Sequence, residues 1–467
     1  MQDRPGLPNV ASLRERDIAF HFHPMTNPAK HERVGPTIVA GGEGCYFEDE
    51  QGKRYLDMHA GLWCTALGLS EQRLKDAAMR QFDKLSYSQT FAHRTTEPVV
   101  ELADALIRLA PASISKVQFQ CSGSEANDTA VKFAWFYWAA KGEPQRRKII
   151  ARTKAYHGTT AVAASMTHLP HMHKGFGLPL PGFLHAPHPD IYRGIAEGES
   201  EADYATRLVG ELEKIIEQEG PDTVAAFIAE PVMGAGGVYP PPLTYFEKVQ
   251  DLLKQYGILF IADEVICGFG RTGRWWGSQT FEIKPDIVTC AKALSSAYLP
   301  ISATMISDRV YAEIRAEAER NDAFGHGYTY GGHPVCAAVA CEAVRIYEDD
   351  RLIEQAALRG KFLERKLRAL ESHPLVGQVR GAGLMWGVEI VKDKATKAAF
   401  DTKLQVGVEL SDICFSRGLN TRSLGSGIMT FTPPLIVSEQ ELSIAVSKFT
   451  ESLDELHGRM TKDGRLN

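Results

Sequence analysis

Residues 257–294 read GILFIADEVICGFGRTGRWWGSQTFEIKPDIVTCAKAL and contain two short apolar runs, each closely followed by a charged side chain. Neither run alternates apolar with polar residues, which predicts strands that are buried on both faces. Outward from this stretch the pattern recurs, with apolar runs at 117–121, 148–153, 224–229, 258–262, 287–290 and 301–306 and helical patterns at 205–219 and 244–256. This order predicts an α/β fold with a large central, mostly parallel sheet wrapped by helices.

The two ends of the chain have a different pattern. Two short strand-like segments at 45–49 and 54–57 flank Gln51-Gly52-Lys53, which predicts a hairpin. The C-terminal part predicts helices at 335–347, 351–371 and 438–456 with short strands at 384–391 and 428–431. We therefore predict a large domain at 66–334 and a small α+β domain built from both chain ends, residues 1–65 and 335–467.

The composition indicates an enzyme-sized protein of the cytoplasm. The 467 residues are 44% hydrophobic and 24% charged, and the net charge of -6 argues against a nucleic-acid partner. The apolar runs are too short for a membrane span, and the first residues lack the apolar stretch of a secretory signal. Eight scattered cysteines without a CxxC pair fit a reducing compartment. We expect neither nucleic-acid nor membrane partners, and a cytoplasmic location.

Polar residues follow three of the predicted strands, where ligands of open α/β sheets gather. Ser122-Gly123-Ser124-Glu125 has the spacing of a capping box, and a helix start of this kind can hold a phosphate. An ordinary helix cap without a ligand is the alternative. Asp263 and Lys292 follow the runs at 258–262 and 287–290. A charge at the end of a buried strand costs free energy unless an opposite charge or hydrogen bonds compensate it. A structural salt bridge and a surface lysine are the alternatives for these two.

Together the three sites match one cofactor. Pyridoxal 5'-phosphate (PLP) requires a lysine that forms an imine, an acid for its pyridine nitrogen and a cup for its phosphate. The lysine is freed when a substrate amine displaces it, and it can then move a proton. We therefore predict PLP held as an internal aldimine on Lys292.

Seven motifs resemble the class III aminotransferases, especially their ω-transaminase branch, over nearly the whole chain. They are AGLWC (60–64), SGSEA (122–126), YHG (156–158), AEPV (229–232), ADEVICGFGRTG (262–273), AKALSSAYLP (291–300) and GYTYGGHPVCAA (327–338). The resemblance implies the type I fold of PLP-dependent transferases and a homodimer, or a tetramer, with shared active sites. It also implies the site residues: Lys292 as the catalytic residue, Asp263 at the pyridine nitrogen, Gly123 and Ser124 at the phosphate, Tyr156 and Val265 on the two ring faces, Glu230 near the ring oxygen and Thr329 at the phosphate of the neighbouring subunit.

The resemblance also bears on the substrates. Family members that use ornithine, acetylornithine or 4-aminobutyrate usually carry an acid at the position of Ala235, so its absence argues against those donors. Trp63 and Tyr156 are expected to line the donor pocket, and Arg422 to bind a substrate carboxylate. We therefore expect a ping-pong transfer from a primary amine or ω-amino acid to a keto acid, and the resemblance to the pyruvate-using ω-transaminases implies that this acid is pyruvate. The alternatives are another PLP reaction of the family, an aminomutase or a decarboxylase, and a cofactor-free binding protein on this fold.

A metal site is not predicted. His168, His171, His173, His185 and His188 lie within one stretch, but they do not form a convincing ligand set with a carboxylate or cysteine. We interpret them as surface or loop histidines.

Overall fold

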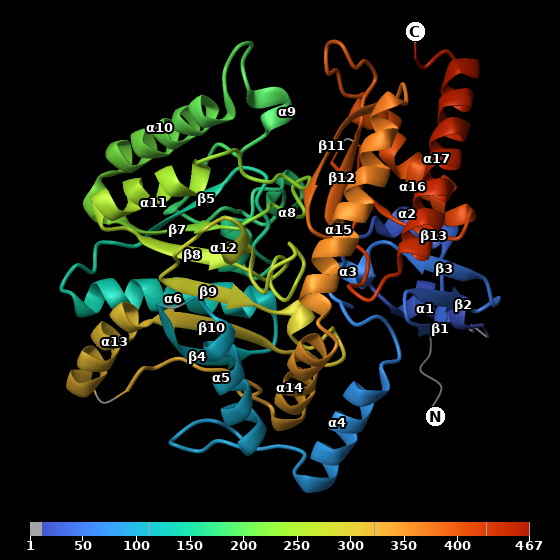
Figure 1. Ribbon diagram of the computed structural model, residues 1–467. Helices are drawn as coiled ribbons and strands as arrows, with labels where there is room; N and C mark the ends of the chain where they lie inside the picture. Colours follow the sequence, from blue (N-terminus) through green and yellow to red (C-terminus); the bar gives the residue numbers. More distant parts are fainter. Residues whose placement is uncertain (1–11, 112, 322, 426, 467) are drawn as a thin grey trace, which may run out of the picture.

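The computed structural model describes residues 12–111, 113–321, 323–425 and 427–466. Its centre is a seven-stranded sheet in the order β4-β10-β9-β8-β7-β5-β6 (Figure 1). These strands are β4 (Ile114–Gln120), β5 (Lys148–Arg152), β6 (Phe183–Ala186), β7 (Val224–Ala229), β8 (Leu259–Asp263), β9 (Ile287–Cys290) and β10 (Ser302–Ser307). The neighbours from β9 to β6 are parallel, whereas β10 is antiparallel to both β9 and β4. The predicted mostly parallel α/β sheet is confirmed.

The sheet is buried on both faces because helices cover it. Every residue of β7, β8 and β9 is buried, as the unbroken apolar runs predicted. One face packs against α6 (Gly123–Ala140) and α13 (Asp308–Asn321), and the other against α10 (Glu201–Glu219) and α11 (Tyr245–Tyr256). The helices cover the two faces of the sheet and leave the carboxyl ends of these strands accessible.

The remaining helices are mostly short or lie outside the central sheet. They are α1 (Leu13–Phe20), α2 (Pro28–Val34), α3 (Ala60–Trp63), α4 (Gln72–Lys84), α5 (Glu97–Leu109), α7 (Ala161–Met166), α8 (Pro170–His173), α9 (Ile191–Gly194), α12 (Gly277–Thr280), α14 (Pro334–Asp349), α15 (Leu352–Arg368), α16 (Val406–Ser416) and α17 (Glu439–Lys462). Short 3₁₀ turns occur at η1 (Pro221–Thr223), η2 (Lys292–Leu294), η3 (Ala369–Ser372) and η4 (Thr402–Leu404). The predicted C-terminal helices are present with longer or shifted ends.

Two small sheets lie beside the large one. The first contains β1 (Val39–Glu43), β2 (Tyr46–Asp49), β3 (Arg54–Asp57) and β13 (Leu419–Asn420), and the second β11 (Val376–Ala382), β12 (Met385–Ile390), β14 (Arg422–Leu424) and β15 (Ile428–Phe431). The predicted hairpin is β2 and β3, and β13 pairs with β3 across more than three hundred residues of chain. Both chain ends therefore meet in one sheet, while the boundaries 1–65, 66–334 and 335–467 stay predictions. Residues 1–11 of that first segment lie outside the described part.

The chain's cysteines and helices limit its environment only in part. All eight cysteines are free, and six of them are buried. Across the described residues, none of the helices combines the length and the apolar character that a bilayer crossing needs.

Candidate active site

A cavity of about 110 Å³ lies at the carboxyl ends of the central strands. It contains all seven residues predicted for the cofactor within one chain: Gly123, Ser124, Tyr156, Glu230, Asp263, Val265 and Lys292. It is also lined by four residues that were not predicted: Asn127, His157, Gly158 and Ile266. Segments far apart in the sequence thus form one site at the edge where α/β proteins bind ligands.

Lys292 stands directly after β9, at the start of the turn η2. Its backbone is in the left-handed region, with φ of 51°, a conformation that is strained for a residue with a side chain. Burial lowers the pKa of its amine, while Asp263 opposes that shift. No hydrogen bond or ion pair from its amine to any described residue is found, so the nitrogen is free to act as a nucleophile. Such an amine is suited to form an imine with a carbonyl compound.

Asp263 ends β8, the strand next to β9, and is 3% exposed. One carboxylate oxygen accepts from Asn127 Nδ2 at 2.9 Å and faces His157 Nδ1 at 2.7 Å. The other oxygen accepts from the backbone N–H of Val265 at 3.0 Å. These contacts fix the orientation of the carboxylate at the edge of the cavity.

The adjacent acid, Glu264, has another role. Its carboxylate accepts from the backbone N–H groups of Gly277 and Ser278, at 2.9 and 2.6 Å, and from the Ser278 hydroxyl. Burial raises the pKa of Glu264 to about 7. Its oxygens are thus bound to a neighbouring loop, and Asp263 alone of the pair lines the cavity.

The N-terminus of α6 offers a place for an anion. Ser122 is the N-cap, and its hydroxyl accepts from the N–H of Glu125 at 3.2 Å. The Glu125 carboxylate accepts from Cys121 N, one residue earlier than the reciprocal capping box would require. A Cβ on Gly123 would come within 2.9 Å of Val265, so glycine permits this close approach. Free N–H groups in the first turn of an 18-residue helix can hold a phosphate.

Glu230 organises the wall on the other side. Its carboxylate accepts from the backbone N–H of Tyr156 at 3.2 Å and from that of Gly234 at 2.7 Å. Burial raises the pKa of Glu230, and it also raises that of Tyr156. The carboxylate therefore ties the Tyr156 loop to the loop that follows β7.

Trp63 lies in a small apolar cluster near the cavity. It is 4% exposed and packs among residues that include Met233, Ile266 and Ile428. Its indole N–H donates to His59 Nδ1 at 2.8 Å, and a Cβ on Gly234 would come within 2.2 Å of the indole. The predicted wall residue is therefore also a core residue, and it borders the cavity through Ile266.

Arg422 and Thr329 do not line the cavity. Arg422 is on β14, and its residue is exposed. None of the described residues forms a hydrogen bond or ion pair with its guanidinium. Burial lowers the pKa of His59 to about 3, and the charge of Arg422 adds to that effect, which places the guanidinium near His59. Thr329 is exposed, and its carbonyl accepts from the hydroxyl of Tyr87. Within one chain, Thr329 is thus away from the cavity.

Sequence reasoning missed Asn127, which directly follows the SGSEA motif, and His157, which lies in the YHG motif. Asn127 is one turn after Gly123 on the buried face of α6, and His157 follows Tyr156. A buried polar residue beside two predicted site residues is the signal that could have found them.

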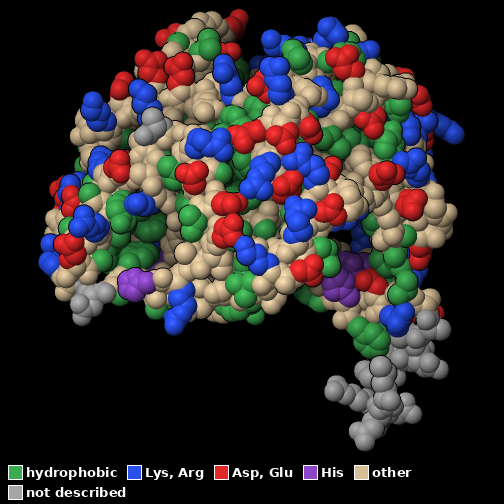
Figure 2. All heavy atoms as spheres, turned by 60° about the horizontal axis from the view of Figure 1, so that its bottom comes forward, with side chains coloured by type: hydrophobic (Ala, Val, Ile, Leu, Met, Phe, Trp, Pro, Cys, Tyr) green, Lys and Arg blue, Asp and Glu red, His purple; other side chains and the backbone are tan. Residues whose placement is uncertain are grey.

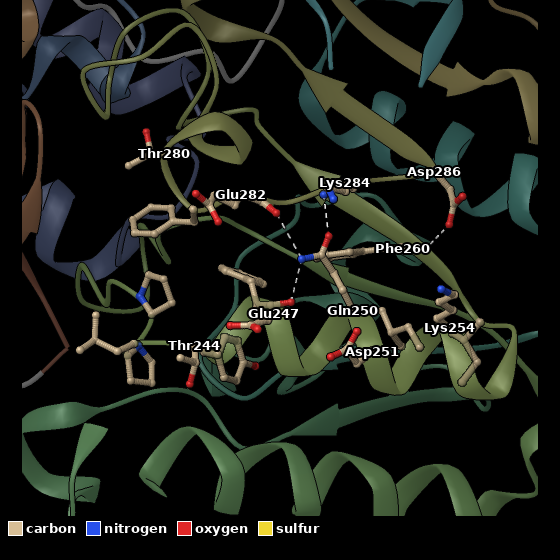
Figure 3. Close-up of a pocket in the computed structure, with 18 of the residues that line it drawn as sticks. Thr244, Glu247, Gln250, Asp251, Lys254, Phe260, Thr280, Glu282, Lys284 and Asp286 are labelled. Carbon is tan, nitrogen blue, oxygen red and sulfur yellow. Dashed lines mark hydrogen bonds between the residues drawn. The ribbon is translucent and has the colours of Figure 1, made fainter. Parts of the chain in front are cut away.

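A larger hollow of about 800 Å³ lies elsewhere on the large domain, along α11 and the segment before β9 (Figure 3). The side-chain amide of Gln250, which lines this hollow, accepts from the backbone N–H of Lys284 at 2.7 Å and donates to the carbonyl of Phe246 at 2.9 Å. Its polar groups thus hold the walls together, and no predicted site residue lines it.

Comparison with known proteins gives consistent matches over almost the entire chain. The family described as Aminotransferase class-III matches residues 28–453. The chain is 45% identical to gamma aminobutyrate transaminase 1, mitochondrial, of Solanum lycopersicum, over 94% of this chain and 85% of that protein. It superposes on the omega transaminase from Pseudomonas jessenii in complex with PMP, with a TM-score of 0.94 and 48% identity, over 96% of this chain and 98% of that one. It is as similar, with a TM-score of 0.93, 48% identity and coverage of 96% and 99%, to a thermostable variant in which a tryptophan is replaced by glycine, engineered for asymmetric synthesis of enantiopure bulky amines.

Proposed function

The chain belongs to the class III aminotransferase family, and we propose that it passes the amino group of a primary amine or ω-amino acid to pyruvate, with Lys292 as its catalytic residue. Transamination with PLP is the activity of this enzyme. The observation that carries the residue assignment is that a Lys292 amine without a hydrogen-bond or ion-pair partner among the described residues and a fixed Asp263 carboxylate lie at the ends of adjacent strands.

The residues around the cavity fit the cofactor. Asp263 would hold the proton on the pyridine nitrogen, and the first turn of α6 with Ser124 would hold the phosphate. Tyr156 and Val265 would cover the two ring faces, and Glu230 would stand on the side of the ring oxygen. When bound, the cofactor supplies an electron sink for the bond that breaks at the amine-bearing carbon.

Lys292 has the central role among the protein groups. Its amine is freed when the substrate amine takes its place, and it then moves a proton away from the donor carbon. Burial keeps the pKa of this amine low, so a neutral, basic form is accessible. Proton transfer by a positioned group of this kind contributes about 10²–10⁴-fold to the rate.

Trp63 and Arg422 would contact different parts of the substrates. Trp63 would limit the size of the donor, which the engineered tryptophan variant of the Pseudomonas relative supports. Arg422 would bind the carboxylate of the keto acid, and the lack of an ion-pair partner for its guanidinium within the described part of the chain supports this role. Tyr156, near both groups, would contact either substrate.

The donor class is wider than Ala235 alone suggested. Alanine at this position argued against 4-aminobutyrate, yet a relative 45% identical is named for that substrate. 4-Aminobutyrate therefore belongs among the candidate donors, together with β-alanine, taurine, diamines and aryl-alkyl amines.

We also propose a homodimer, or a tetramer, with Thr329 serving the phosphate of the partner. Exposure of Thr329, away from the cavity of its own chain, supports this arrangement. Dilution should then release cofactor as dimers dissociate. A protein that is monomeric by light scattering and keeps full activity would contradict the shared site. A cytoplasmic location stays a prediction, since the tomato relative is named as mitochondrial.

A donor panel tests the proposed reaction. Each amine is incubated with the holoenzyme and pyruvate, and both alanine and the carbonyl product of the donor are measured. Equal amounts of the two products are expected. An aminomutase would rearrange the amine without consuming pyruvate, and a decarboxylase would release carbon dioxide, so either result would replace the proposed transfer.

A further inference from the structure

The N-terminal segment from α1 to α2 brings one carboxylate and three imidazoles to a single point. Asp17 is in the last turn of α1, His21 and His23 follow it, and His31 is on α2. Asp17 Oδ2 is 2.8 Å from His23 Nε2 and 3.0 Å from His31 Nε2, and Oδ1 is 3.1 Å from His21 Nδ1. Figure 2 shows histidine side chains gathered beside acidic ones toward the right of the molecule.

The three rings also face one another closely. The ring centroids of His21 and His23 are 4.2 Å apart, and those of His23 and His31 are 4.1 Å apart. Ligand atoms of Asp17, His21 and His23 all lie within 4.8 Å of one another. The side chains of Asp17, His23 and His31 are 20, 26 and 11% exposed, so the group is partly shielded yet open to an ion from solvent.

We propose that Asp17, His21 and His23 form a site for a divalent transition-metal ion such as Zn²⁺, with water as the fourth ligand. Zinc prefers imidazole nitrogen and carboxylate oxygen ligands at about 2.0–2.2 Å in a tetrahedron, whose ligand atoms then stand roughly 3.3 Å apart. Asp17 Oδ1 is 3.1 Å from His21 Nδ1 and 3.0 Å from His23 Nε2, so these pairs need only a small expansion to admit the ion. Two neutral imidazoles and one carboxylate would leave a single positive charge, and His31 would hold the other oxygen of Asp17.

The fold of this segment gives the ion a purpose. Neither α1 nor α2 has a buried residue, so no apolar core holds the two helices together. Arg14, which donates to the carbonyls of Val34 and Pro36, is a further link between them. Because His31 on α2 contacts Asp17 Oδ2, an ion held by Asp17 would fix the point where the two helices meet and contribute order that apolar packing does not supply.

A second group of histidines shows what a non-metal arrangement looks like. His168 and His185 have ring centroids 4.6 Å apart, and His173 lies near both. However, His173 and His185 each direct Nε2 to a backbone carbonyl, that of Ala164 at 2.9 Å and that of Met166 at 3.3 Å. Among the described residues, only Asp17, His21 and His23 form a group with metal-ligand spacing. The metal site is therefore proposed near α1 and not among His168, His173 and His185.

Metal titration of the untagged holoenzyme tests the proposal. After dialysis against a chelator, Zn²⁺ alone is titrated and followed by calorimetry, with turnover as a check of the fold. We expect one saturable Zn²⁺ per chain, and at least about tenfold weaker binding in His23→Ala and Asp17→Asn. The matched control is His171→Ala, which removes an exposed histidine of α8 and should leave the affinity unchanged.

Two further readouts keep the outcome clear if a variant loosens the segment. Co²⁺ bound to the unaltered chain should give the intense visible bands of a four-coordinate ion. Zn²⁺ should also protect residues 12–36 from limited proteolysis in the unaltered chain and in His171→Ala, but not in His23→Ala. Absence of saturable binding, a six-coordinate Co²⁺ spectrum, or equal affinity in His23→Ala and His171→Ala would overturn the proposal.

Discussion

Replacing Arg422 by alanine should separate the two half-reactions. The guanidinium stands on β14 near His59 with no described partner, so the substitution removes a cation that the folded chain does not itself use. Only a substrate with a carboxylate loses an interaction. An uncharged amine such as an aryl-alkyl amine should react almost as before.

The size of the effect follows from the kind of contact. A hydrogen bond between charged groups contributes about 1.5–3 kcal/mol. With about 1.4 kcal/mol for each factor of ten, kcat/KM for pyruvate should fall roughly 10- to 150-fold, mainly through KM. Arg422→Lys keeps the charge but lacks the planar guanidinium, so its kcat/KM for pyruvate should lie between that of the unaltered enzyme and that of Arg422→Ala.

The assay measures initial rates with pyruvate varied at saturating amine, and then with an uncharged amine varied at saturating pyruvate. We expect kcat/KM for pyruvate to fall, while kcat/KM for the uncharged amine stays within about twofold of that of the unaltered enzyme. Equal losses for both substrates would refute the reasoning, since the arginine would then support the fold or the cofactor rather than a carboxylate.

The other substitutions concern the cofactor, the donor pocket and the buried histidines. Asp263→Asn should bind the cofactor more weakly and lose about 10²-fold or more in kcat because the ring nitrogen is no longer kept protonated; cofactor affinity and turnover that match the unaltered enzyme would make the acid structural. Trp63→Ala should cost about 3–5 kcal/mol of unfolding free energy because the indole is buried, while relative rates shift toward bulkier amines; an unchanged donor profile in this variant would assign the residue to the core alone. Burial lowers the pKa of His188 from 6.5 to about 3, so the unfolded chain binds more protons than the folded chain between these pH values. The contribution of neutral His188 to the free energy of unfolding is therefore lost as the pH falls from about 6.5 toward 3. In denaturant titrations, His188→Gln should therefore reduce the loss of unfolding free energy in that window by up to about 1.4 kcal/mol per pH unit, and an unaltered slope would speak against a buried neutral histidine.

The sequence predicted the central sheet well because its strands are buried on both faces. The strands at 224–229 and 287–290 match β7 and β9 to the residue, and that at 258–262 is shifted by one. The edge strand β6 was missed because only two of its four residues are buried, so its sequence lacks a long apolar run. β11 was missed for a related reason, since most of its residues are half-buried and polar or small.

The candidate site was predictable wherever a charged residue ends a buried strand. Asp263 and Lys292 stand out for that reason, and the cavity brings them together. Asn127 and His157 were not found because their role depends on a contact between α6 and the loop after β5, which sequence spacing does not encode. The Asp17 group was not predicted because the approach of His31, on α2, to Asp17 occurs only in the folded chain.

One measurement tests the central claim most directly. The purified holoenzyme is reduced with borohydride, which makes a lysine–cofactor bond permanent, and the digested chain is mapped by mass spectrometry. The assignment predicts the pyridoxyl group on the peptide that carries Lys292, in about one copy per chain, and its loss together with turnover in Lys292→Ala. A pyridoxyl group on another lysine, or normal turnover in Lys292→Ala, would contradict the assignment.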